Sequence, residues 1–162
     1  EKPLIAAVNG VAAGAGTALA LACDMVIASE SARFAPNFVN IGAVPDSGAS
    51  WYLPRAVGYH KAAELMLTGR LLKAEEALGM GLFNRVVPAA DLEKETLDLA
   101  RRMSSGPREA IRSIKKMLKM SRFNSLDSQL DIEATLQVMA WSHQEFAEGV
   151  KAFLEKRSPR FS

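Results

Sequence analysis

Two segments of the sequence carry residues whose types and spacing could do chemistry. The first is the glycine-rich turn from Gly10 to Gly16, which separates an apolar run from a helix-forming stretch. A strand that ends in such a turn before a helix leaves main-chain N–H groups at the positive end of the helix dipole. We expect the donors beside Ala13 and Gly14 to hold negative charge, and charge that develops during a reaction would make the turn an oxyanion hole. Tight packing of the strand against the helix is the alternative explanation of these glycines.

The second segment is Val44-Pro45-Asp46-Ser47-Gly48, which lies just before a helical run that reaches Val57. An aspartate in this place can act as an acid or base, or it can cap the helix by accepting main-chain N–H bonds. The segment contains no Gly-x-Ser-x-Gly elbow, which argues against Ser47 as a nucleophile. The carboxylate of Asp46 is therefore the candidate catalyst here.

Other site chemistries find less support in the sequence. A dinucleotide-binding fingerprint would need a third glycine where Leu19 stands, and no acidic residue ends a following strand at the usual distance. His60 and His143 are interpreted as surface or capping groups. Together with the single Cys23 they provide too few ligands for a zinc cluster, so no metal site is predicted.

The elements that must position these residues indicate an α/β fold. Apolar runs at residues 4–8 and 24–28 predict buried parallel strands joined by a helix, which is a strand, helix, strand crossover. Residues 34–44 are expected to be irregular. A short extended piece is predicted at residues 86–88, and there the sequence divides into a core (1–88) and a helical extension (89–162). The predicted helices cover residues 60–68, 74–80, 92–104, 108–120, 126–146 and 149–157.

Composition excludes several classes of protein. With 162 residues, 49% of them hydrophobic, the chain can bury a core. Its net charge of +2 is too small to indicate a nucleic acid partner, and none is expected. A single cysteine excludes an intrachain disulfide framework and favours a reducing, cytoplasmic compartment. Residues 4–23 carry no charge, but the glycines among them argue against a signal or membrane segment; lipoprotein processing at Cys23 is the alternative. The start at Glu1 and Lys2, directly before a strand, predicts a fragment of a longer protein.

Several motifs occur in one order along nearly the whole chain, and together they resemble the enoyl-CoA hydratase/isomerase (crotonase) superfamily. The resemblance implies the C-terminal part of a crotonase, ClpP-like ββα-superhelix, followed by a helical trimerisation region. The motifs are Asn9-Gly10-Val11-Ala12-Ala13-Gly14-Ala15-Gly16, Cys23-Asp24, Phe34, Ile41-Gly42-x-x-Pro45-Asp46-x-Gly48, Thr68-Gly69, Ala74-Glu75-Glu76-Ala77-x-x-x-Gly81-Leu82 and Phe153-Leu154-Glu155-Lys156-Arg157.

The same resemblance implies a site. In this family two main-chain amides polarise a thioester carbonyl, and the resemblance assigns the second amide to Gly14. Hydratases carry two glutamates at positions that here hold Ala18 and Phe38, neither of which can transfer a proton. Water addition by two glutamates is therefore not expected. Asp46 stands where isomerases have an acidic residue, and residues 38–48 are most similar to the phenylacetate-pathway branch.

The function that follows from the resemblance is an acyl-CoA isomerase that shifts a double bond or opens a ring epoxide through a thioester enolate. Phe38, Val44 and Trp51 are expected to surround Asp46, raise its pKa and contact the substrate. Lys156 matches a lysine that reaches the CoA phosphate from an adjacent subunit; a solvated lysine is the alternative. The expected partners are an acyl-CoA thioester and further copies of the chain in a trimer or hexamer, with no membrane and no cofactor besides the CoA of the substrate. A hydratase-like enzyme, an aryl-CoA dehalogenase-like enzyme and a non-catalytic acyl-CoA-binding fragment stay open as alternatives.

Overall fold

The structure is a computed structural model that describes residues 2–161. It divides into two compact units: residues 4–98 form one, and residues 99–161 with Lys2 and Pro3 form the other. The boundary falls inside helix α5 (Leu92–Ser104), about ten residues after the predicted boundary at residue 88. The first turn of α5 belongs to the core unit because Leu92 is buried there and Glu95 pairs with Arg85 at 3.6 Å.

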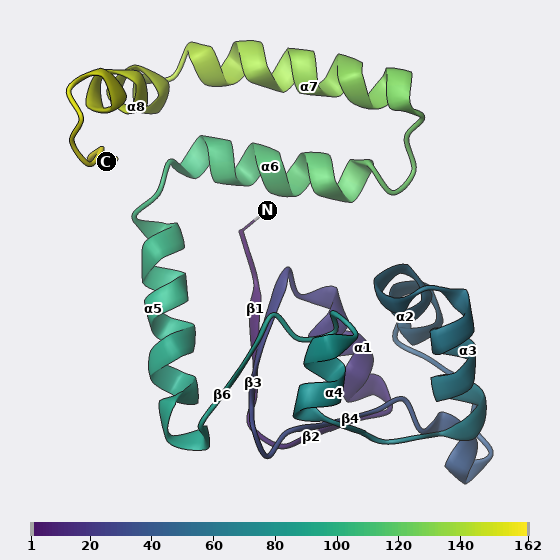
Figure 1. Cartoon of the computed structure of the whole chain (residues 1–162). Coiled ribbons are helices and arrows are strands. Elements are labelled where there is room, and N and C mark those ends of the chain that lie inside the picture. Colours follow the sequence, from purple (N-terminus) through teal and green to yellow (C-terminus); the bar gives the residue numbers. More distant parts are fainter. Residues whose placement is uncertain (1, 162) are drawn as a thin grey trace. The chain divides into compact units, whose positions relative to one another are not determined.

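A parallel sheet forms one part of the core unit, in the strand order β1-β3-β6 (Figure 1). Its strands are β1 (Ile5–Val8), β3 (Met25–Ser29) and β6 (Arg85–Val87). Helix α1 (Ala15–Ala22) connects β1 to β3, and Ile5 stands opposite Met25 in the parallel register. The predicted crossover is therefore confirmed. Most of β3 is buried, as expected for a strand inside a parallel sheet.

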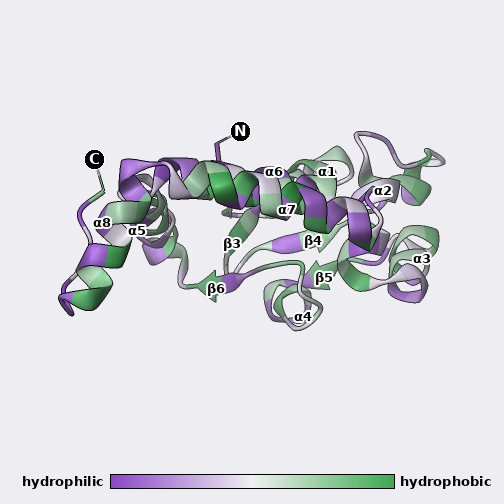
Figure 2. Cartoon of the chain, turned by 90° about the horizontal axis from the view of Figure 1, so that it is seen from above, coloured by the Kyte–Doolittle hydropathy of each residue, from purple (hydrophilic) through white to green (hydrophobic). Residues whose placement is uncertain are grey.

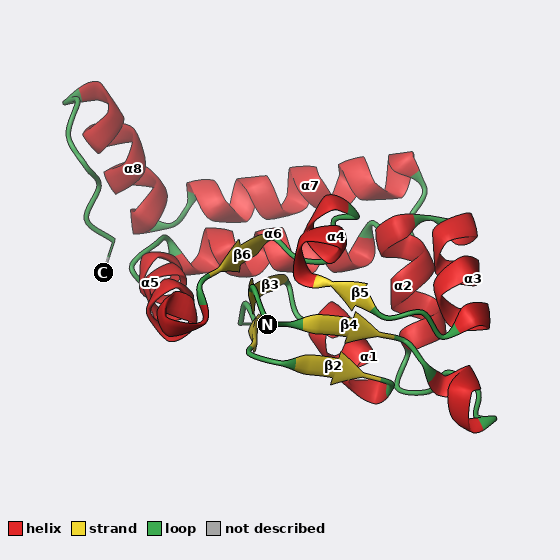
Figure 3. Ribbon diagram, turned by 60° about the horizontal axis from the view of Figure 1, so that its bottom comes forward, coloured by secondary structure: helices red, strands yellow, loops and turns green. Residues whose placement is uncertain are grey.

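A second three-stranded sheet was not foreseen from the sequence. Figure 3 shows its strands side by side in the order β2-β4-β5, which are β2 (Val11–Ala13), β4 (Arg33–Ala35) and β5 (Leu72–Lys73). Strands of two or three residues are too short to show alternation in the sequence. The expectation that residues 34–44 are irregular is thus wrong at both β4 and the 3₁₀ turn η1 (Phe38–Ile41).

Three helices complete this unit around an apolar cluster. They are α2 (Ala49–Val57), α3 (Tyr59–Thr68) and α4 (Ala74–Gly79), and the 3₁₀ turn η2 (Ala89–Asp91) precedes α5. The helix α3 ends at Gly69, whose φ of 62° is the left-handed conformation that favours glycine, as the sequence predicts. The largest side chains of the cluster are Phe34, Leu53, Leu65, Leu72 and Phe83.

The other unit is helical and comprises the end of α5 with α6 (Arg108–Met120), α7 (Leu126–Trp141) and α8 (Gln144–Leu154). Hydrophobic and hydrophilic residues alternate along α6 and α7 (Figure 2). The single helix predicted over residues 126–146 is wrong. It stops at Trp141 because the Ser142 hydroxyl donates to the Met139 carbonyl at 2.7 Å and His143 is extended. None of the helices within residues 2–161 combines the length and hydropathy that crossing a membrane requires.

Candidate functional site

The glycine-rich turn joins β2 to α1, and Gly14 is its pivot. Its φ of 49° and ψ of −121° lie in a region that residues with a Cβ rarely adopt, which explains the glycine. The Gly14 amide donates to the carbonyl of Ala35 at 2.9 Å, next to the register pair Ala13 and Ala35. This amide continues the sheet pairing, so the assignment of Gly14 as the oxyanion donor is wrong.

The next amide along the chain can serve instead. Ala15 is the first residue of α1, and within residues 2–161 its N–H and that of Gly16 meet no acceptor. Thr17 does not share this property, because its amide donates to the Gly14 carbonyl at 3.0 Å. No acidic side chain occupies the first turn of α1. The positive end of this helix therefore presents two unpaired donors, beginning one residue later than the sequence indicates.

An apolar cluster lies beside this helix end. Phe38 is 7% exposed and packs with Ala18 and Ala49, both of which are almost fully buried. Two ring atoms of Phe38 lie 3.7 and 3.9 Å from the point that a Cβ on Gly14 would occupy. Two positions at which the sequence resemblance places hydratase glutamates, Ala18 and Phe38, therefore meet in one buried apolar cluster.

Asp46 opens a tight turn in front of α2. Its carbonyl accepts from the Ala49 amide at 2.8 Å, and the two central residues, Ser47 and Gly48, have φ values of 51° and 86°. Two positive φ values in succession characterise a type I′ turn. A serine in this conformation costs of the order of 1 kcal/mol or more, and such strain is typical of functional turns. The turn fixes the backbone at Asp46 while leaving its side chain in the open.

The Asp46 side chain does not cap the helix. The N-cap of α2 is Gly48, which has no side-chain capping bond, so the capping interpretation is wrong. Within residues 2–161 no hydrogen bond or ion pair reaches the Asp46 carboxylate, and the residue is exposed. The predicted apolar enclosure is also absent from this part of the chain: Val44 is 79% exposed, and Phe38 is buried against Gly14 instead.

Trp51 contacts Tyr52 and Arg55, two neighbours on its own helix. Its ring centroid is 5.0 Å from that of Tyr52 in an edge-to-face arrangement, and the Arg55 guanidinium lies 4.2 Å from the Trp51 ring centroid. Arg55 also donates to the Trp51 carbonyl at 3.0 Å. These contacts hold Trp51 half-buried on α2, two residues after Ala49 of the apolar cluster. Within residues 2–161 no hydrogen bond joins Trp51 to Asp46.

Lys156 belongs to the helical unit and follows the end of α8. Its φ is 54°, and its amide donates to the Phe153 carbonyl at 3.2 Å while the Arg157 amide donates to that of Ala152 at 3.0 Å. These two bonds form a Schellman motif, whose left-handed position glycine usually fills. Lys156 is exposed, as both interpretations of this lysine require.

The histidines and the metal-binding side chains form no further centre. His60 lies in the first turn of α3, and His143 precedes α8 without a side-chain capping bond. Across the residues that the structure describes, no three His, Cys, Asp or Glu side chains gather closely enough to hold a metal ion.

Comparisons with known proteins agree on one family. The sequence model named Enoyl-CoA hydratase/isomerase matches residues 1–162. The chain belongs to this family. Its fold is that of the crotonase superfamily: a solved enoyl-CoA hydratase from Polaromonas sp. superposes with a TM-score of 0.95 at 39% identity, covering 99% of this chain and 63% of that one.

Two curated relatives differ in the reactions that their names state. A probable enoyl-CoA hydratase from Rhodobacter capsulatus is 46% identical over 160 residues. The 1,2-epoxyphenylacetyl-CoA isomerase of Escherichia coli is 44% identical over 161 residues. Each match covers 99% of this chain but only 62% of the relative. Membership of the enoyl-CoA hydratase/isomerase family thus leaves the reaction type to be argued from the site.

Proposed function

We propose that the full-length protein is an acyl-CoA isomerase in which Asp46 moves a proton and the amide of Ala15 stabilises the thioester oxygen. The observation that carries this proposal is the apolar cluster of Ala18, Phe38 and Ala49. A hydratase that adds water through two glutamates needs carboxylates at the first two of these positions. With both absent, Asp46 is the carboxylate that the site offers for proton transfer.

The reaction needs one base and one oxyanion donor. The Asp46 carboxylate removes a proton from the carbon next to the thioester carbonyl of a 3-enoyl-CoA. The electron pair of the broken C–H bond passes into the carbonyl, and the Ala15 N–H donates to the enolate oxygen. Asp46 then returns the proton to the γ carbon, and the double bond ends between the α and β carbons. No electrons are gained or lost overall, so the reaction needs no redox cofactor. CoA takes part only as a portion of the substrate.

Opening of a ring epoxide on a CoA thioester would use the same two groups, and the identity to the epoxyphenylacetyl-CoA isomerase supports it. An aryl-CoA dehalogenase-like reaction, with Asp46 as nucleophile, is a second candidate. It is favoured by the absence of any hydrogen bond to the Asp46 carboxylate within residues 2–161. The dehalogenase-like reaction passes through a covalent aspartyl ester on Asp46, whereas the isomerase reaction does not.

A homo-oligomer, either a trimer or a hexamer, is part of the proposal, with Lys156 reaching the CoA phosphates of a neighbouring subunit. Large apolar side chains exposed on the helical unit support it, because such faces mark interaction surfaces. They include Leu118, Phe123, Leu126, Val138, Trp141, Phe153 and Leu154. The cytoplasm is the proposed compartment, in line with the single cysteine.

The product distribution of the full-length protein tests the proposed reaction. With a 3-enoyl-CoA we expect conversion to the 2-enoyl-CoA, and with a 2-enoyl-CoA we expect hydration at least about 100-fold slower than isomerisation, since a general acid–base group is missing for water addition. Chromatography of the thioesters measures both rates. A 3-hydroxyacyl-CoA as the main product would contradict the proposal, and halide release from a 4-chlorobenzoyl-CoA would favour the dehalogenase-like alternative.

A further inference from the structure

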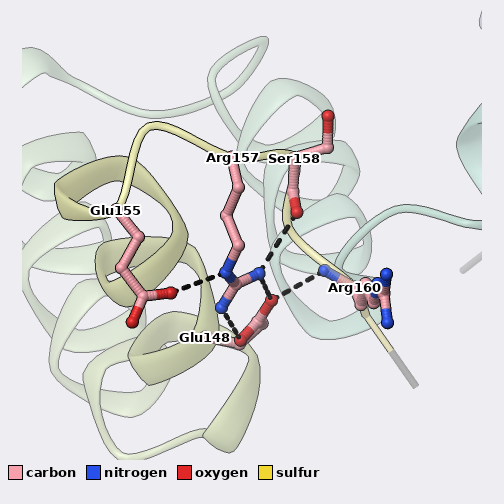
Figure 4. Close-up of polar contacts among 5 residues, drawn as sticks. All are labelled: Glu148, Glu155, Arg157, Ser158 and Arg160. Carbon is pink, nitrogen blue, oxygen red and sulfur yellow. Dashed lines mark hydrogen bonds and ion pairs between the residues drawn. The ribbon is translucent and has the colours of Figure 1, made fainter.

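The segment after α8 is tied to the helix by one carboxylate. Glu148 accepts from both terminal nitrogens of Arg157, at 2.7 Å to Oε1 and 3.0 Å to Oε2, and Oε1 also accepts from the Arg160 amide at 2.8 Å (Figure 4). Surface ion pairs contribute little as a rule, but paired bonds from one guanidinium to one carboxylate are the geometrically specific exception. Glu148 therefore fixes the chain on the C-terminal side of Lys156.

This tie supports the unusual backbone of Lys156. A φ of 54° is unfavourable for a lysine, and the two Schellman bonds hold it only if Arg157 stays against the helix end. The bidentate pair between Arg157 and Glu148, which precedes it by nine residues, keeps Arg157 in this place. The direction in which Lys156 leaves the helix is thus set by its neighbours.

The same cluster keeps the Lys156 ammonium group available. Its nearest carboxylate in the sequence is Glu155, which accepts instead from the Arg157 Nε at 2.7 Å (Figure 4). In the described part of the chain no hydrogen bond or ion pair reaches the Lys156 side chain. Arg157 therefore engages both glutamates and leaves the lysine as an exposed cation on a fixed backbone.

We propose that Glu148 is a positioning residue, which acts through Arg157 to present Lys156 to the phosphate groups of the CoA thioester. The proposal rests on two parts of the proposed function, the binding of a CoA ester and the contact of Lys156 with its phosphates in the oligomer. It adds a residue that does not itself touch the ligand. A lysine binds phosphate as a point charge on a flexible stem, so fixing its backbone lowers the conformational entropy that binding must overcome.

The charge of Glu148 makes this arrangement stable across the working pH range. Hydrogen bonds from the Arg157 side chain and the Arg160 amide lower the pKa of Glu148 to about 2. A carboxyl with a lowered pKa gives its stabilisation above its ordinary pKa and loses it as the pH falls through the lowered value. Glu148 should therefore stay charged and paired with Arg157 from weakly acidic to alkaline pH.

The test compares two unreactive ligands of the full-length protein: a saturated acyl-CoA and the same acyl group on pantetheine, which lacks the nucleotide phosphates. We expect Glu148→Gln to weaken binding of the acyl-CoA about 3-fold and Lys156→Ala about 5-fold, with affinity for the acyl-pantetheine unchanged. The double variant should bind no more weakly than Lys156→Ala alone, because the two residues act in series. Calorimetry measures the affinity of the unmodified protein and of the three variants for both ligands.

Glu133→Gln is the matched control, because Glu133 is exposed on α7 and takes part in no hydrogen bond or ion pair within residues 2–161. It should leave both affinities unchanged. Arg157→Lys keeps the positive charge but loses the paired bonds to Glu148, so it should weaken acyl-CoA binding as Glu148→Gln does. It therefore serves as a second test if Glu148→Gln folds poorly. Normal acyl-CoA binding by Glu148→Gln, equal losses for both ligands, or additive losses in the double variant would each overturn the proposal. Since neither ligand reacts, a protein without isomerase activity can still pass this test, which separates the two proposals.

Discussion

Replacing Asp46 by asparagine is expected to abolish isomerisation of a 3-enoyl-CoA. Loss of a positioned acid–base group lowers kcat by about 10²- to 10⁴-fold, and here Ala18 and Phe38 occupy the positions at which the sequence resemblance places the hydratase glutamates. The fold should not suffer, because no hydrogen bond to the Asp46 carboxylate is recorded within residues 2–161. Affinity for a saturated acyl-CoA and the melting temperature should therefore match those of the unmodified protein.

Asp91→Asn provides the control for the lost charge. Asp91 is exposed in the same unit, at the end of η2, so its variant should keep full activity. Isomerisation by Asp46→Asn within a few-fold of the unmodified rate would remove Asp46 from the mechanism. A covalent adduct on Asp46, detected by mass spectrometry after incubation with an aryl-CoA, would instead make it a nucleophile.

The second large effect is expected from Ala15→Pro. Proline lacks the amide hydrogen, and removal of one oxyanion donor lowers kcat by about 10²- to 10³-fold. Ala15 is the first residue of α1, where proline is well tolerated and where its missing N–H breaks no bond within residues 2–161. The loss should therefore appear in kcat, with the free energy of unfolding nearly unchanged in urea denaturation.

Ala15→Gly separates the amide from the side chain. Glycine keeps the N–H and removes only the methyl group, so this variant should retain most of the activity. If Ala15→Pro were as active as Ala15→Gly, the oxyanion donor would lie elsewhere. A large fall in the stability of Ala15→Pro would show that the structure of the helix end, and not the chemistry, had been lost.

The long amphipathic helices and the strand–helix–strand crossover of this fold are predictable from the sequence. The helix at residues 92–104 and the one at 108–120 match α5 and α6, because several turns of amphipathic spacing average out local exceptions. The crossover from β1 to β3 is predictable for a similar reason, since an apolar run ends at Asn9-Gly10 and another follows the helix. Family membership was also within reach, because ordered motifs extend along the whole chain.

The details that set the chemistry depend on single hydrogen bonds. A glycine-rich turn indicates unpaired amides, but only the pairing of β2 with β4 shows that the Gly14 N–H is used by Ala35. The first orphan donor of a helix lies at its first residue, so a helix start placed at Ala15 instead of Gly14 would have indicated the Ala15 amide. The turn at Asp46 was likewise hidden, because Ser47 gives no sequence signal of a positive φ.

A crystal structure of the full-length protein with a saturated acyl-CoA tests the central claim most directly. The account predicts the thioester oxygen about 2.7 to 3.1 Å from the Ala15 nitrogen, with the Asp46 carboxylate facing the carbons α and γ to the carbonyl. A thioester oxygen remote from Ala15, or another carboxylate closer to the α carbon than Asp46, would contradict it.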